Sequence, residues 1–103
     1  KMQIVTLNKA DPAHLAAVIE QMRKLGAPSI ACIKDEGTGV WVALEGSHRV
    51  AAAKALGLVP EIVEYEYDGD AMLSDYVELD ADNYSIEALF DNLGARPFYV
   101  FAE

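Results

Sequence analysis

The feature of this sequence that most constrains its fold is an abrupt change of pattern at Gly46. Residues 40–44 form a short run of apolar residues, as in a buried strand, and an alanine-rich helical segment follows at once over residues 47–56, where Gly57 ends it. A strand that passes directly into a helix is typical of proteins in which helices pack on a sheet. The sequence therefore predicts an α/β or α+β fold, with a small mixed sheet and packed helices.

A second helix is expected over residues 12–25, because Asp11 is a good N-cap, Pro12 suits the first helical position and Gly26 ends the pattern. Its apolar stripe is formed by Leu15, Val18, Ile19, Met22 and Leu25. Further strands are expected over residues 2–7, 30–33, 61–67, 76–79 and 97–101, and a last helix over residues 86–93, between Ser85 as N-cap and Gly94. Residues 30–33 and 40–44 are expected to form a hairpin, with Val40, Val42 and Leu44 on one face and Trp41 and Ala43 on the other.

Charge is distributed unevenly along the 103 residues, whose net charge is −9. Residues 1–59 carry a balance of +2, whereas residues 60–103 carry −11 and hold Arg96 as their only basic residue. Proteins that bind duplex DNA need a basic face to displace counterions, so no direct duplex DNA binding is expected. With no repeat and no linker, residues 1–103 are interpreted as one domain, in which residues 67–103 form an acidic C-terminal extension.

Cysteine content and hydropathy indicate the compartment. Cys32 is the only cysteine, so it cannot form an internal disulfide, and its apolar neighbours favour a buried residue over a reactive thiol. No apolar run approaches the roughly 20 residues that span a bilayer. We therefore expect a soluble, cytoplasmic protein that has no membrane segment and no structural metal, since no His/Cys group has metal-ligand spacing.

The turn at residues 45–49 is the candidate functional site. Free N–H groups and the helix dipole make a helix N-terminus attractive to anions, and Gly46 lets a ligand approach the backbone. Arg49 is unfavourable in a first helical turn unless an anion binds there, while Ser47 adds a hydroxyl and His48 a titratable donor. Glu45 is the candidate base or metal ligand. The alternative is purely structural: Ser47 caps the helix, His48 is a surface residue and Arg49 pairs with an acid.

The stretch VWVALEGSHRVAAAKALGLVPEIVE, residues 40–64, resembles the second conserved box of the ParB/sulfiredoxin superfamily. The resemblance covers about residues 3–66, and its most specific part is EGSHRVAAAKALG. It implies a nucleotide-phosphate cradle at Gly46, Ser47, His48 and Arg49. Ser47 stands where sulfiredoxins have their cysteine, so sulfiredoxin chemistry is not expected. Several members also grip phosphate with an Arg after the first strand, where this chain offers only Lys9.

The resemblance implies ATP or CTP as the ligand, bound with Mg²⁺ that Glu45 helps to hold. If the protein is an enzyme, it implies nucleotide-dependent phosphotransfer or hydrolysis, with Glu45 and His48 as catalytic residues. Two alternatives stay open. One is a non-catalytic protein-interaction or regulatory module, whose acidic half meets a protein partner or whose fold forms a homodimer. The other is a protein associated with partition-type DNA complexes.

Overall fold

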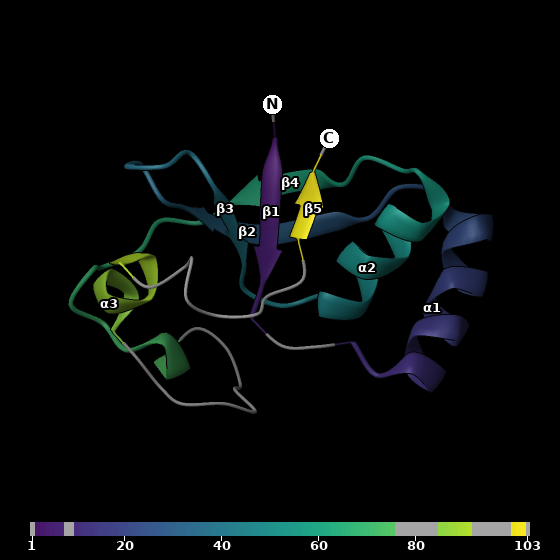
Figure 1. Cartoon of the computed structure of the whole chain (residues 1–103), viewed down its shortest axis with the longest axis horizontal. Helices are drawn as coiled ribbons and strands as arrows, with labels where there is room; N and C mark the ends of the chain where they lie inside the picture. The colour runs from purple at the N-terminus through teal and green to yellow at the C-terminus, as the bar shows by residue number, and fades with distance from the viewer. Residues whose placement is uncertain (1, 8–9, 76–84, 92–99, 103) are drawn as a thin grey trace.

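The computed structural model describes residues 2–7, 10–75, 85–91 and 100–102 (Figure 1). The described elements follow one another as β1 (Gln3–Thr6), α1 (Pro12–Leu25), β2 (Ser29–Lys34), β3 (Trp41–Ala43), α2 (Ser47–Leu56), β4 (Glu61–Glu64), the 3₁₀ turn η1 (Leu73–Asp75), α3 (Ile86–Asp91) and β5 (Val100–Ala102). No helix among these residues is long and apolar enough to cross a membrane.

The strands form one sheet in the order β4-β2-β3-β1-β5. β2 and β3 are the expected antiparallel hairpin, whose loop is closed by the Asp35 N–H donating to the Val40 carbonyl at 2.9 Å. β1 lies parallel to β3 and β4 lies parallel to β2, while β5 runs antiparallel to β1. The mixed sheet and the α+β class predicted from the sequence are confirmed.

The two faces of the sheet are covered by different parts of the chain. One face packs on α2, through a cluster that contains Ile4, Ile30, Cys32, Ala43 and Val50, with Trp41 at its margin. The other face packs on η1 and α3, through a cluster that contains Val5, Leu7, Ile33, Val42, Leu44, Leu73, Ile86 and Leu89, with Val40 at its margin. The predicted division of residues 40–44 between two faces is confirmed.

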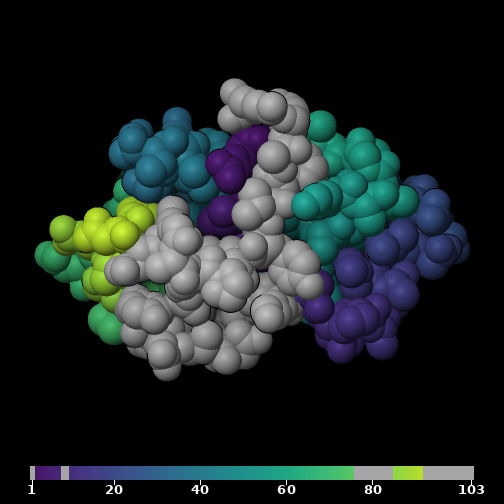
Figure 2. Space-filling view, in the orientation of Figure 1, coloured from purple at the N-terminus to yellow at the C-terminus, as the bar shows by residue number. Residues whose placement is uncertain are grey.

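Helix α1 forms an outer layer that packs on α2 (Figures 1 and 2). The interface is built around Met22 with Ala52 and Ala53, all three buried. Ala52 and Ala53 of α2 pack in this cluster with α1, and Val50 supplies the contact between α2 and the sheet. The expected stripe of α1 is wrong at its last member, because Leu25 is 83% exposed.

Helix ends agree with the predicted caps where they are described. The Asp11 carboxylate accepts from the His14 N–H at 3.0 Å, and the Ser85 hydroxyl accepts from the Ala88 N–H at 3.1 Å. β4 ends at Glu64, earlier than the predicted residue 67. The strand expected over residues 76–79, the residues before Val100 in the strand expected over 97–101, and the helix end at Gly94 lie outside the described residues.

Candidate functional site

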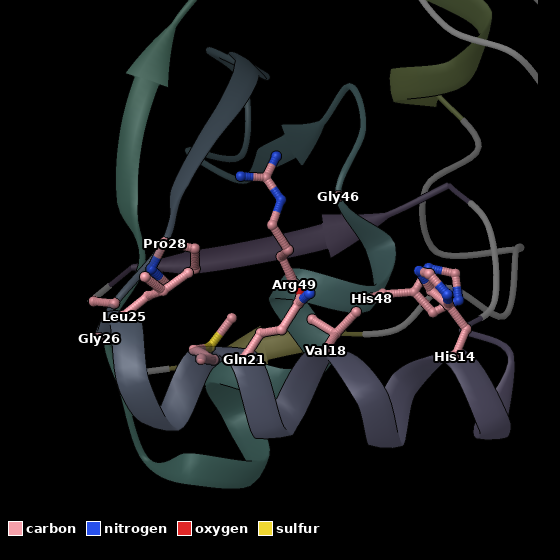
Figure 3. A pocket seen from close by; sticks show the side chains of 11 residues that line it. His14, Val18, Gln21, Leu25, Gly26, Pro28, Gly46, His48 and Arg49 are labelled. Carbon is pink, nitrogen blue, oxygen red and sulfur yellow. The ribbon is translucent and has the colours of Figure 1, made fainter.

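A cavity of about 400 Å³ lies between α1 and the first turn of α2 (Figure 3). Its walls come from one face of α1, from the chain that leaves α1, and from α2. The lining residues are His14, Val18, Gln21, Met22, Leu25, Gly26, Ala27, Pro28, Gly46, His48 and Arg49. None of them is acidic, and Arg49 is the only one with a permanent charge, in a chain whose net charge is −9. The cavity therefore offers a local environment suited to an anion.

The N-terminus of α2 carries no side-chain cap. Gly46 is its N-cap residue, and the first backbone bond within the helix runs from the Val50 N–H to the Gly46 carbonyl at 2.8 Å. The N–H groups of Ser47, His48 and Arg49 have no acceptor among the described residues. Asp11 and Ser85 satisfy such groups at α1 and α3. The turn that the sequence singled out thus presents open donors beside the cavity.

Glycine is required at position 46 for two separate reasons. Its φ of 87° lies in the left-handed region, which residues with a Cβ adopt only at a cost. A Cβ there would also lie 3.3 Å from Nη2 of Arg49 and 3.3 Å from Cδ1 of Ile30, and Ile30 is fully buried. The space that a side chain at position 46 would occupy is therefore bordered by the Arg49 guanidinium and by the buried core.

The structure gives Arg49 a partner that neither sequence hypothesis named. Its Nη1 donates to the backbone carbonyl of Ser29 at 2.9 Å, and it forms no ion pair with a described acid. This bond uses one of the five N–H groups of the guanidinium. In Figure 3 the side chain lies between the two histidines at one end of the cavity and Leu25, Gly26 and Pro28 at the other. Arg49 is held in place by its bond to Ser29, and its remaining donors can still serve a ligand.

His48 connects α2 to the start of α1. Its Nε2 accepts from the Asp11 N–H at 2.9 Å, so this nitrogen is unprotonated and, in the neutral ring, the proton is on Nδ1. Its ring also meets that of His14 in a T-shaped contact with 4.3 Å between centroids. His14, which is exposed, lines the cavity together with His48. The sequence signal that could have placed His14 at the site is its position three residues after the cap Asp11, close to the N-terminus of α1.

The other predicted site residues are placed differently. Ser47 is the first residue of α2 and Glu45 is exposed, and neither lines the cavity. Lys9 lies outside the described residues. No group of three or more His, Cys, Asp or Glu side chains in the described part of the chain could hold a metal ion. Magnesium is usually held by one or two carboxylates together with substrate phosphates, so Glu45 can supply one carboxylate ligand to such an ion.

Comparisons with known proteins add no relative: the chain matches no family model, no curated protein and no solved structure. The resemblance to the ParB/sulfiredoxin superfamily therefore stays a prediction, which rests on the residues of the turn and its flanking segments.

Proposed function

We propose that this domain binds the phosphate of a nucleotide at the N-terminus of α2, with the rest of the ligand in the cavity beside α1. The observation that carries the proposal is the coincidence of the uncapped α2 N-terminus, Arg49 and a cavity without acidic residues. Backbone N–H groups and the dipole of a ten-residue helix attract an anion, and Arg49 adds a charged donor.

The walls of the cavity support a ligand that is polar at one place and apolar elsewhere. Val18, Met22 and Pro28 line it with apolar surface, and the volume of about 400 Å³ falls in the range of small-molecule sites. A base and sugar would lie on the apolar wall, and the phosphate would lie at Gly46 and Arg49. The ParB/sulfiredoxin resemblance supports the same class of ligand, ATP or CTP, with Mg²⁺ brought by the nucleotide and Glu45 as its one protein ligand.

The proposal is for binding rather than catalysis. His48 is one of the two predicted catalytic residues, but its Nε2 accepts from the Asp11 N–H and is not available to a substrate proton while that bond is intact. Phosphotransfer or hydrolysis by Glu45 and His48 stays a prediction. We further propose a cytoplasmic location, because an unpaired Cys32 suits a reducing compartment.

A thermal-shift panel of ATP, CTP and GTP, with and without Mg²⁺, tests the proposal. A ligand present at 100 times its dissociation constant should add about 2.7 kcal/mol to the free energy of unfolding. Arg49→Ala should weaken binding by about 1.5–3 kcal/mol, the scale of a charge-assisted hydrogen bond, and Arg49→Lys should restore part of it. Arg49→Ala should also destabilise the free protein slightly, because the bond to Ser29 is lost.

Arg23→Ala is the matched control for charge. Arg23 is exposed on α1, pairs with Glu20 at 3.2 Å and does not line the cavity, so its loss removes the same charge without touching the site. Equal losses of affinity in both variants would show that only net charge matters. If no nucleotide shifts the melting of the unsubstituted protein, the proposal fails and the non-catalytic interaction module becomes the better interpretation.

A further inference from the structure

The β4 edge of the sheet has features that the nucleotide proposal does not use. β4 is the terminal strand of the sheet and pairs only with β2 among the described residues. A terminal strand has one row of backbone N–H and C=O groups directed away from the sheet, where another strand can pair with them.

The register identifies which groups point outward. The N–H of Glu61 donates to the Pro28 carbonyl and that of Tyr65 to the Cys32 carbonyl, each at 2.8 Å, so these residues direct their backbone toward β2. Backbone direction alternates along a strand, so Val63 also faces β2, whereas Ile62 and Glu64 present their N–H and C=O groups to the open edge.

The side chains beside this edge are apolar on one face of the sheet. Val63 and Tyr65 are 42% and 51% exposed, and they lie on the α3 face, because Ile62, the residue before Val63, packs in the cluster on the α2 face and side chains alternate along a strand. Edge strands are commonly blunted by charged side chains or covered by another element, and beside the glutamates of this edge two large apolar side chains are exposed to solvent.

The charge of the edge selects what can bind. Glu61, Glu64 and Glu66 are exposed, and none of them forms an ion pair with a described residue. Two copies of β4 paired together would gather six exposed glutamates, three from each copy, on one short strand pair, and these like charges would repel one another. A strand that carries Lys or Arg on the α2 face would instead meet the opposite charges of Glu64 and Glu66.

We propose that the β4 edge binds an extended basic segment of a protein partner as an added strand. The segment forms backbone hydrogen bonds with Ile62 and Glu64, places apolar side chains beside Val63 and Tyr65, and directs Lys or Arg toward the glutamates. This interaction is independent of the cavity and goes beyond nucleotide binding.

The test mixes the full chain with a fluorescent peptide in which Lys and Val alternate. Binding is measured by fluorescence anisotropy and by amide hydrogen exchange. Binding should slow exchange at the Ile62 and Glu64 amides and leave the Val63 amide unchanged, because Val63 already donates to β2. A peptide in which Glu and Val alternate should not bind, and added salt should weaken the binding of the Lys–Val peptide.

Two variants of one residue separate backbone pairing from charge. Glu64→Gln should weaken binding about two- to fivefold, as expected for one exposed ion pair. Glu64→Pro removes an outward N–H that β2 does not use, so it should weaken binding at least about tenfold while the fold is kept. If the proline variant does not fold, the exchange pattern of the unsubstituted chain decides.

Three results would overturn the proposal. The first is slowed exchange at residues other than Ile62 and Glu64. The second is equal binding of the acidic peptide. The third is protection of these two amides in the protein alone that increases with its concentration, because a second copy of the chain would then be the occupant.

Discussion

The two glycines that flank α2 allow a sharp test of how its N-terminus is built. Gly46 and Gly57 both have left-handed backbone, with φ of 87° and 70°. An added Cβ at Gly57 meets nothing within 4 Å, whereas at Gly46 it lies 3.3 Å from Arg49 Nη2 and from Ile30 Cδ1. Gly46→Ala and Gly57→Ala therefore share the cost of a left-handed backbone. Only Gly46→Ala has the added cost of close contacts to the new Cβ.

The expected magnitudes follow from this difference. Left-handed backbone costs a residue with a Cβ about 1–2 kcal/mol, so Gly57→Ala should lose about that much stability. Gly46→Ala should lose a further 1–3 kcal/mol or so, because fully buried Ile30 has little room to move and Arg49 is tethered to Ser29.

Chemical denaturation and thermal melting measure both variants. In a domain of about this size 1 kcal/mol corresponds to about 4–8 °C, so Gly46→Ala should melt at least about 5 °C below Gly57→Ala. Nucleotide should stabilise Gly57→Ala as it does the unsubstituted chain, and should have less effect on Gly46→Ala. Equal destabilisation of the two variants would refute the close packing of Gly46 on Arg49 and Ile30.

Three further predictions follow from other parts of the fold. Burial raises the pKa of the Cys32 thiol from 9.0 to about 12, so the unfolded chain loses this proton first, and stability should fall between pH 9 and pH 12. Denaturation across this pH range should show a slope up to about 1.4 kcal/mol per pH unit steeper than in Cys32→Ala, and equal slopes would contradict the burial. Met22→Ala should cost about 2–4 kcal/mol in denaturation, whereas Leu25→Gln should cost less than about 0.5 kcal/mol; similar costs would mean that Leu25 is buried. Asp11→Ala should cost about 1 kcal/mol through loss of the cap on His14, and Asp11→Asn should retain most of that stability in the same assay.

Local patterns predicted most of the described elements. α2 has the predicted bounds, Ser47–Leu56, because a strand pattern, Gly46 and Gly57 mark both ends. α1 begins after its predicted cap Asp11 for a similar reason. These signals act within a few residues of one another, so they can be interpreted without knowledge of the rest of the fold.

Contacts between distant segments were beyond such patterns. The parallel pairing of Ile4 with Trp41 depends on the whole sheet, and no local signal specifies it. Leu25 continues the apolar period of α1 yet is exposed at the cavity, whereas Met22, three residues earlier, is buried against Ala52 and Ala53 of α2. Periodicity indicates which face is apolar, but packing against the partner helix decides how much of that face is buried.

At the candidate site, the sequence indicated the turn, and the structure added its surroundings. Gly46, His48 and Arg49 line a cavity, as residues of one strand-to-helix turn can. The bonds from Arg49 to Ser29 and from Asp11 to His48 were not predictable, since they join residues 20 and 37 positions apart. Both give structural tasks to side chains that the sequence had assigned to ligand chemistry.

The position of β5 beside β1 has a consequence for how this domain can be linked to other chains. Gln3 lies opposite Ala102 in an antiparallel pair, so the start of β1 and the end of β5 lie side by side in the sheet (Figure 1). A domain with adjacent ends can be inserted into a surface loop of a host protein without stretching it. The same adjacency lets a short linker join the ends, so that a circularly permuted chain opened in the loop between β2 and β3 should keep the sheet order.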